Sequence, residues 1–290
     1  MLVIYIYICR LFAIIIFMKI ITNINELQES IKEQKSTIGF VPTMGALHEG
    51  HVSLIKQARS ENKTVVVSIF LNPTQFLKGE DLSSYPSKNE ADIKICELSG
   101  VDILFMPNIN TMYDEDEIGI TAPKIRGFIL EGHSRPGHFD GVLQIVLKLF
   151  NLVQPTNAYF GKKDAQQLAL IKQMTKNLFL NINIVECEII RDENGLALSS
   201  RNTYLNDKEK IIALNISKSL KEATKLILEG EKDINILVQC MENILKDTEV
   251  EYIKIVSRNF DYINSYIPQN SIILVAVKVG TTRLIDNLWV

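Results

Sequence analysis

The sequence predicts an α/β fold: a doubly wound, Rossmann-like parallel sheet with a second, smaller α+β domain at the C-terminus. Short apolar runs with almost no polar alternation, typical of parallel strands buried on both faces, alternate with segments of helical spacing. Glycine-containing turns follow two of these runs. From about Asn194 the pattern changes to helical segments followed by strand-like runs. We therefore expect one domain over residues 18–193 and another over residues 194–290.

The first domain is expected to alternate between helices and strands. Its first helix is amphipathic, because Leu27 and Ile31 are four residues apart and share a face. A later helix is expected to begin at Ser87, which stands in capping-box spacing with Glu90. In chain order the expected elements are a helix over 25–35, a strand over 37–41, a helix over 52–62, a strand over 64–71, a helix over 87–99, a strand over 101–106, a helix over 139–153, a strand over 158–160, a helix over 164–177 and a strand over 182–190.

The second domain is expected to hold two helices and at least two strands. The helices are predicted over residues 207–228 and 233–246, and the strands over 252–256 and 271–279. Because this domain begins beside a polar loop, we expect it to act as a lid.

Charge and cysteine content narrow the class of protein. The net charge is −3 and no stripe of Lys and Arg is interleaved with aromatic residues, which argues against a nucleic-acid partner. The four cysteines form no Cys-x-x-Cys pair, which argues against a disulfide framework and favours a reducing compartment.

The N-terminus is an apolar segment. Residues 2–18 are apolar except for Arg10, and this length is near the lower limit for a membrane span. The segment has no small-x-small cleavage site, which argues against its removal as a signal peptide. We interpret residues 1–17 as an extension from an early start site, outside the fold, and expect no membrane association. A genuine membrane anchor is the alternative.

The loop over residues 42–51, PTMGALHEGH, stands between an expected strand and an expected helix. Unpaired backbone N–H groups at a helix N-terminus favour phosphate, and Gly45 and Gly50 allow the backbone to come close to it. His48 and His51 are three residues apart, so they are expected on one face, where two ring nitrogens can stabilise charge on a transferring phosphoryl group. Two satisfied or solvated histidines are the alternative. Zinc is disfavoured because the chain has only four histidines and no Cys pair near this loop.

Three further polar segments follow expected strands or turns. Residues 161–167, GKKDAQQ, open a helix and by themselves also fit an ordinary helix start with exposed lysines. Residues 198–202, LSSRN, offer two hydroxyls and a guanidinium, which suit a phosphate clamp or a domain-linking turn. Asn72 and Gln75 follow the buried strand over 64–71, at the edge where open α/β sheets bind ligands, and their neutral amides can satisfy a hydroxyl and a carboxylate.

The segment PTMGALHEGHVSLIKQA, residues 42–58, resembles the signature of the pantoate–β-alanine ligase family, in the superfamily of nucleotidylyl transferases with a His-x-Gly-His loop. The resemblance covers about residues 18–287. It implies ATP-dependent condensation of (R)-pantoate with β-alanine to pantothenate, AMP and pyrophosphate, through a pantoyl adenylate. It also implies Mg²⁺ with ATP, a homodimer and a cytoplasmic location. The remaining alternatives are another nucleotidylyl transferase with a phosphate acceptor, and a non-catalytic nucleotide-binding protein.

The resemblance also assigns site residues. It implies that His51, His48 and Lys163 are catalytic, that Gly161 and Asp164 face the ribose, and that Gln75, Gln167 and Asn72 bind pantoate or β-alanine. No metal ligand is assigned. The implied ATP-binding residues are Met44, Gly45, Ala46, Leu47, His48, Glu49, Gly50, His51, Gly161, Lys162, Lys163, Asp164, Ile190, Leu198, Ser199, Ser200 and Arg201.

Other segments match the family as well. Residues 130–139 match a segment near the pantoate pocket, and Gly79 to Leu82 with Tyr85 resemble a mobile loop over the site. Lys162 stands where an acidic residue is common, Asp140 where Arg is frequent, and Leu198 where Met is frequent. Lys162 is therefore expected to add positive charge beside the phosphates.

Overall fold

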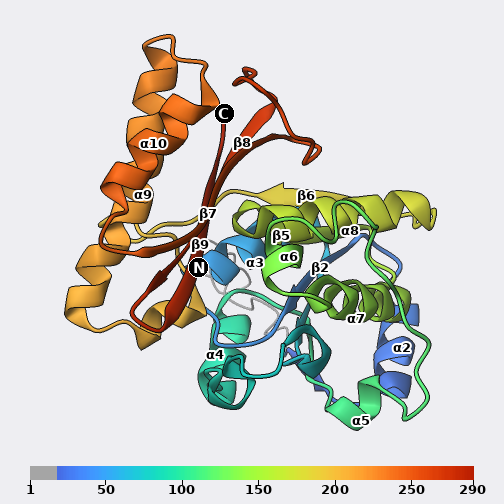
Figure 1. Cartoon of the computed structure of the whole chain (residues 1–290). Coiled ribbons are helices and arrows are strands. Elements are labelled where there is room, and N and C mark those ends of the chain that lie inside the picture. Colours follow the sequence, from blue (N-terminus) through green and yellow to red (C-terminus); the bar gives the residue numbers. More distant parts are fainter. Residues whose placement is uncertain (1–17) are drawn as a thin grey trace, which may run out of the picture.

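The computed structural model describes residues 18–290, and its first sheet has six parallel strands. Helices flank this sheet, and a second sheet follows near the C-terminus (Figure 1). The spatial order in the first sheet is β1-β4-β3-β2-β5-β6, and every neighbouring pair is parallel. The strands are β1 (Lys19–Ile21), β2 (Ile38–Thr43), β3 (Thr64–Ile69), β4 (Ile103–Phe105), β5 (Asn157–Gly161) and β6 (Asn183–Cys187). All six residues of β3 are buried, as the uninterrupted apolar run predicts for a central strand.

Helices cover both faces of this sheet. One face packs against α2 (Ile24–Lys32), α7 (His138–Val153) and α8 (Ala165–Asn177), which share a core with Phe40 and Val66. The other face packs against α3 (Glu49–Glu61) and α4 (Asn89–Leu98), whose Ile55 and Cys96 are fully buried. The short elements are α5 (Ile109–Met112), α6 (Glu131–Ser134) and the 3₁₀ helices η1 (Pro73–Gln75), η2 (Asp81–Ser84), η3 (Lys162–Asp164) and η4 (Ser200–Tyr204).

The C-terminal part has its own sheet and core. β7 (Glu249–Ser257), β8 (Ser271–Val279) and β9 (Thr282–Trp289) form an antiparallel sheet in that order. α9 (Asp207–Leu228) and α10 (Ile234–Ile244) lie on one side of it, and their apolar residues share a core with β7 and β8. The predicted fold class, a doubly wound sheet followed by a smaller α+β unit, is confirmed.

Two ion pairs and an amide join the C-terminal sheet to the first one. Arg191 binds both carboxylate oxygens of Asp286 in β9, at 2.6 and 2.9 Å. Arg283 of β9 binds both oxygens of Glu131 in α6, at 2.8 and 2.7 Å. The Asn287 amide donates to the carbonyl oxygens of Lys162 and Lys163. Residues of β9 therefore bind both α6 and η3, the short helix that follows β5.

The strand order places the expected loops at one edge. The order reverses between β2 and β5, which lie side by side, so their following loops flank the crevice at the switch point where ligands bind in such sheets. The His-containing loop follows β2, and η3 with Lys163 follows β5. Asn72 and Gln75 follow β3, the other neighbour of β2.

Several local expectations need correction. β1 was not predicted, because its three residues form too short a run to stand out as a strand. α3 begins at Glu49 and not at residue 52, since His48 acts as its N-cap. Ser87 does not cap α4: the N-cap is Lys88, which makes no side-chain capping bond. The expected extension or anchor over residues 1–17 lies outside the described residues, and within residues 18–290 no helix is long and apolar enough to cross a membrane.

Candidate active site

A carboxylate from α4 holds the loop between β2 and α3. Asp92, only 1% exposed, accepts hydrogen bonds from the backbone N–H groups of Ala46 and Leu47, both at 2.8 Å. Gly45 and Ala46 have φ values of 86° and 51°, in the left-handed region, which turns successive N–H groups toward one point. The expectation that backbone donors of this loop are unpaired is therefore wrong for Ala46 and Leu47, whose donors bind protein.

His48 and His51 lie together at the start of α3. The Nδ1 atom of His48 accepts from Gly50 N–H at 3.1 Å, and the Nδ1 atom of His51 accepts from His48 N–H at 3.3 Å. Because Nδ1 is the acceptor in each ring, the proton of each neutral ring is on Nε2. The ring centroids are 4.1 Å apart, which confirms the prediction that the two imidazoles share one space.

Both imidazoles are neutral at physiological pH. Burial, with the positive charge of Lys163 nearby, lowers the pKa of His48 to about 4. Burial, with His48 and Lys163, lowers the pKa of His51 to about 3. Each ring therefore offers an Nε2–H hydrogen-bond donor and not a fixed positive charge.

A cavity of about 250 Å³ opens where β2, β3 and β5 end. Its wall brings together side chains from all four polar segments that the sequence analysis singled out. The expected site residues that line it are Met44, His48, Gly50, His51, Asn72, Gln75, Gly161, Lys163, Asp164, Gln167, Ile190, Leu198, Ser199, Ser200 and Arg201. Segments far apart in the chain thus meet around one space beside a helix N-terminus.

Five expected ATP-binding residues lie outside this cavity wall: Gly45, Ala46, Leu47, Glu49 and Lys162. The first three form the turn that Asp92 holds, and Glu49 is exposed. Lys162 forms an ion pair with Glu188, and its Nζ lies 5.7 Å from the centre of the Trp289 ring. Lys162 itself does not line the cavity, and its expected extra charge is compensated by Glu188, which does line it.

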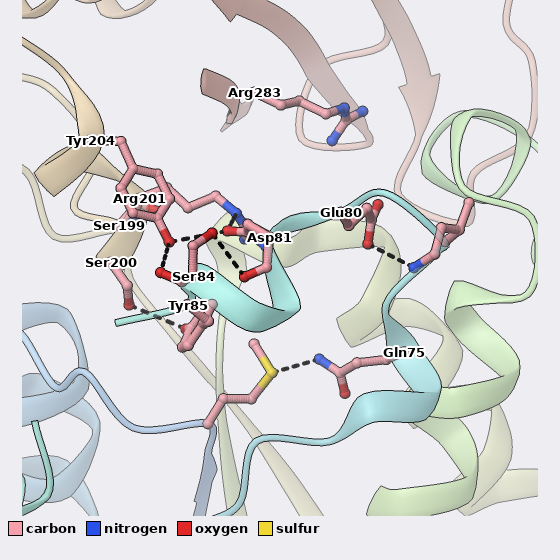
Figure 2. Close-up of polar contacts among 12 residues, drawn as sticks. Gln75, Glu80, Asp81, Ser84, Tyr85, Ser199, Ser200, Arg201, Tyr204 and Arg283 are labelled. Carbon is pink, nitrogen blue, oxygen red and sulfur yellow. Dashed lines mark hydrogen bonds and ion pairs between the residues drawn. The ribbon is translucent and has the colours of Figure 1, made fainter. Parts of the chain in front are cut away.

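The amide of Gln75 is set in place by Asn72. Asn72, 1% exposed, donates through Nδ2 to Gln75 Oε1 and to the Gly141 carbonyl oxygen, both at 3.1 Å. Tyr113 donates its hydroxyl proton to Asn72 Oδ1 at 2.8 Å. Gln75 Nε2 donates to Met44 Sδ at 2.8 Å, as Figure 2 shows. Asn72 thus orients Gln75, whose weakly bound amide nitrogen is free to exchange the thioether for a stronger acceptor.

The LSSRN segment leads into η4, with Ser199 as its N-cap, and the guanidinium of this segment already has an anionic partner. Arg201 donates through Nε and Nη2 to the two carboxylate oxygens of Asp81 in η2, at 2.9 and 2.8 Å (Figure 2). Ser200 donates to the carbonyl oxygen of Ala46 at 3.3 Å and accepts from the Tyr85 hydroxyl at 3.4 Å. This segment therefore connects the His-containing loop to η2.

A larger cavity of about 770 Å³ adjoins the first and reaches toward β9. The residues that line both cavities are Arg135, His138, Lys163, Asp164, Gln167, Ser199 and Arg201. Lys163 Nζ is 3.7 Å from a carboxylate oxygen of Asp164, a separation too long for a hydrogen bond. The side chain of Gln167 makes no hydrogen bond with any of the described residues, so its amide group is available to a ligand.

Sequence reasoning missed several residues of this site. Arg135 binds both oxygens of Glu80 at 2.6 Å and donates to His138 Nε2 at 3.0 Å, while His138 Nδ1 donates to the Gln75 carbonyl oxygen at 2.7 Å. Burial and the charge of Arg135 lower the pKa of His138 to about 4. The signal was present in the segment over residues 130–139, but its partner Glu80 is far away in the sequence.

Comparisons with known proteins identify the family. The sequence pattern of the family described as pantoate-beta-alanine ligase matches residues 19–289. The chain belongs to the pantoate–β-alanine ligase family. It is an ATP-dependent ligase that joins pantoate to β-alanine in pantothenate biosynthesis. The two alternative functions that the sequence left open are therefore set aside.

Relatives of this ligase match it over nearly its whole length. The pantothenate synthetases of Aliarcobacter butzleri and Sulfurimonas denitrificans are 57% and 54% identical over 272 residues, 94% of this chain and 100% of theirs. The crystal structure of pantothenate synthetase from Thermus thermophilus matches with a TM-score of 0.90 at 36% identity, covering 94% of this chain and 99% of that one. A structure of the Francisella tularensis ligase, complexed with beta-gamma ATP and beta-alanine, matches with a TM-score of 0.78 at 39% identity, covering 94% and 97%.

Proposed function

We propose that the 250 Å³ cavity binds ATP beside pantoate and carries the ligation in two steps through a pantoyl adenylate. The observation that supports this proposal is the shared wall, in which three neutral imidazoles, a lysine, two arginines and two glutamines meet at the switch point of the sheet. Cations and hydroxyls suit phosphate, whereas neutral amides suit a small hydroxy acid.

In the first step a pantoate carboxylate oxygen attacks the α-phosphorus of ATP in line, and the bond to the bridging oxygen of pyrophosphate breaks. The chain supplies no covalent nucleophile, so positioning and charge stabilisation carry the acceleration. His51 and His48 donate from Nε2 to phosphate oxygens as charge develops. Lys163, Ser199, Ser200 and Arg201 share the anionic load, and Gln75 and Gln167 hold pantoate.

In the second step the β-alanine amine attacks the acyl carbon of the adenylate. The bond between that carbon and the phosphate-linked oxygen breaks, AMP leaves with this oxygen, and the nitrogen loses its proton. Water would hydrolyse the mixed anhydride, so the site must exclude it. Asp81 and Ser84 of η2 line the adjoining larger cavity, Arg201 binds Asp81, and Arg135 binds the preceding residue, Glu80, which together support a covering role for this segment.

Mg²⁺ is proposed to arrive with ATP. Within residues 18–290 no group of three or more His, Cys, Asp or Glu side chains could hold a metal ion. Glu80 and Asp81 near the cavity are engaged with arginines. This donor set suits an ion held mainly by phosphate oxygens and water, as Mg²⁺ commonly is, and no step is assigned to a protein-bound metal.

We propose that the ligase is a homodimer in the cytoplasm. Ile118 and Ile125 are 84% and 75% exposed, and Phe128 is 47% exposed, so one segment carries three exposed apolar side chains. Light scattering of the purified chain tests the oligomeric state: a mass of two chains is expected, and a mass of one chain overturns this part of the proposal.

Pyrophosphate release tests the adenylate step. With ATP and pantoate but without β-alanine, we expect one pyrophosphate per active site in a rapid phase, followed by slow turnover. With all three substrates, pyrophosphate and pantothenate should form in equal amounts. Release that requires neither pantoate nor β-alanine, or that requires β-alanine for the first turnover, contradicts the proposed sequence of steps.

A further inference from the structure

Two adjacent carboxylates stand at the start of η2, one on Glu80 just before it and one on Asp81, its first residue, and each is bound by an arginine from another part of the site. Glu80 is bound by Arg135, which precedes α7, and Asp81 by Arg201 of η4. Figure 2 shows the Asp81 pair beside Ser84, Tyr85 and Tyr204. Several arginines of the described residues line the two cavities. Of these, Arg201 belongs to the LSSRN segment, for which phosphate binding is proposed.

The Asp81 carboxylate binds the Arg201 guanidinium with the same two-point geometry that a phosphate group uses. Nε and Nη2 of Arg201 reach separate oxygens at 2.9 and 2.8 Å, the two-pronged geometry that Arg also uses for phosphate. Burial opposes ionisation of Asp81, but the hydrogen bonds and charge of Arg201 outweigh it and lower the pKa of the carboxyl. Asp81 is therefore an anion at neutral pH, and it competes with any other anion for Arg201.

The segment that bears Asp81 is attached mainly by polar contacts. None of the residues 76–91, all within the described part of the chain, is buried. Besides the two ion pairs, the Tyr204 hydroxyl donates to the Ser84 carbonyl oxygen at 3.0 Å, and Tyr85 packs edge-on against Phe76. Gly79 has a φ of 93° and open space around it. Few buried apolar contacts mean that this segment can move at low free-energy cost.

We propose that Asp81 is a positioning residue that holds Arg201 in the free enzyme and yields it to the phosphates when ATP binds. This inference depends on the proposed phosphate-binding role of Arg201. In the free enzyme the Asp81–Arg201 ion pair keeps the guanidinium at the cavity wall and holds η2 against η4. When ATP enters, phosphate oxygens replace the carboxylate, because leaving Asp81 beside the triphosphate would place like charges together. After pyrophosphate leaves, Asp81 takes Arg201 again.

The test measures ATP affinity by calorimetry with Mg²⁺ and without pantoate, so that no turnover occurs. Asp81→Asn removes the competing charge, and we expect the Kd for ATP to fall about threefold to fivefold, the upper part of the range for a partly exposed ion pair. Inorganic pyrophosphate should bind more tightly by a similar factor. Asp81→Ala, which removes the carboxylate without adding an amide, should tighten ATP binding as well.

Glu80→Gln is the matched control. It removes the same charge from the neighbouring residue of the same segment, but it breaks the pair with Arg135 and leaves Arg201 bound. We expect its Kd for ATP to stay within about twofold of the unmodified chain, since Arg201 keeps its partner. Equal tightening by Asp81→Asn and Glu80→Gln indicates a general charge effect and overturns the proposal, as does unchanged or weaker binding by both Asp81 variants.

Arg201→Ala separates this inference from the proposed function. Weaker ATP binding by Arg201→Ala, with no further change when Asp81→Asn is added, supports both. Unchanged ATP binding by Arg201→Ala shows that the proposed phosphate role of Arg201 is wrong. Weaker binding by Arg201→Ala, with Asp81→Asn giving its full tightening even in that background, preserves the phosphate role and overturns the exchange.

Discussion

Asp92 shows how a residue that touches no substrate can decide the geometry of a site. Its two oxygens satisfy two successive backbone N–H groups in a turn where Ala46 adopts a left-handed conformation. An Asn side chain keeps the shape but has one acceptor oxygen and places an NH₂ group against the second donor. We predict that Asp92→Asn lowers kcat on the order of tenfold or more, since displaced catalytic groups lose much of their effect.

Asp140→Asn provides the control for this variant. Asp140 also accepts a backbone N–H, from Ala122 at 2.7 Å, but it lines neither cavity. Steady-state kinetics should show near-unchanged kcat for Asp140→Asn. An equal loss of kcat in both variants would mean that the hydrogen bonds of Asp92 stabilise the fold but do not position the catalytic groups.

His51 is expected to make a large contribution to turnover. Its Nε2–H is preorganised by the hydrogen bond at Nδ1, so it can stabilise charge on the phosphates without rearrangement. We predict that His51→Ala lowers kcat on the order of 10² to 10³, the loss typical of one preorganised donor. The exposed His133, which lines neither cavity, serves as the control in the same assay. Near-normal turnover by His51→Ala would contradict the assigned role.

The buried histidines predict a pH dependence of stability. In the folded chain the pKa values of His48, His51 and His138 are lowered to about 4, 3 and 4, whereas the ordinary value is 6.5. Between these values the unfolded chain binds more protons, so the stability that these groups contribute is complete above about pH 6.5 and is lost as the pH falls. Each histidine can contribute up to about 1.4 kcal/mol per pH unit.

Denaturant unfolding between about pH 5.5 and 6.5 measures this dependence, because that range lies above the ordinary carboxyl pKa values and the carboxylates contribute little there. His51→Asn should reduce the slope of unfolding free energy against pH, whereas His133→Asn should leave it unchanged. A slope that is the same in both variants would show that His51 is not held neutral by the fold.

At the scale of elements, β9 connects the two sheets through Arg283. Burial favours neutral Glu131, but Arg283 outweighs it and lowers the pKa of this carboxyl, which also accepts from the Tyr252 hydroxyl at 2.6 Å. Arg283→Met leaves a buried carboxylate without its cation. We predict a loss of about 3 kcal/mol in the free energy of unfolding, typical of a broken buried pair.

Adding Glu131→Gln to Arg283→Met should recover part of that loss, because the remaining group is then neutral. Lys278→Met is a control on the neighbouring strand β8, since the ion pair that Lys278 forms with Glu249 of β7 is exposed. Denaturant unfolding of the three variants measures these differences. If the Arg283→Met variant is as stable as Lys278→Met, the ion pair between Arg283 and Glu131 contributes nothing to the free energy of unfolding.

The elements were more predictable than the contacts between them. Uninterrupted apolar runs and helical spacing are local signals, so the central strands, α9 and β8 follow from the sequence, and so does the edge that carries His48, Gln75 and Lys163. Asp92 and Asp81 could not be assigned in this way. The family resemblance marked residues 79–82 as a loop over the site, but the partners of Asp92 and Asp81 lie 45 and 120 positions away, and no local pattern shows which groups these two carboxylates bind.

At the scale of the whole molecule, the two sheets and the loops between them enclose the cavity in which we propose that the pantoyl adenylate forms. Membership of the family establishes the overall reaction. The side chains that line the cavity support the proposed attack of pantoate on the α-phosphorus of ATP. This order of steps requires that one carboxylate oxygen of pantoate ends on AMP, because the bond broken in the second step is the one to the acyl carbon.

Ligation of pantoate labelled with ¹⁸O in its carboxylate, followed by mass spectrometry of the products, measures the fate of that oxygen. We predict one ¹⁸O atom in each AMP, one retained in the amide carbonyl of pantothenate, and none in pyrophosphate. Unlabelled AMP, or label in pyrophosphate, would contradict it.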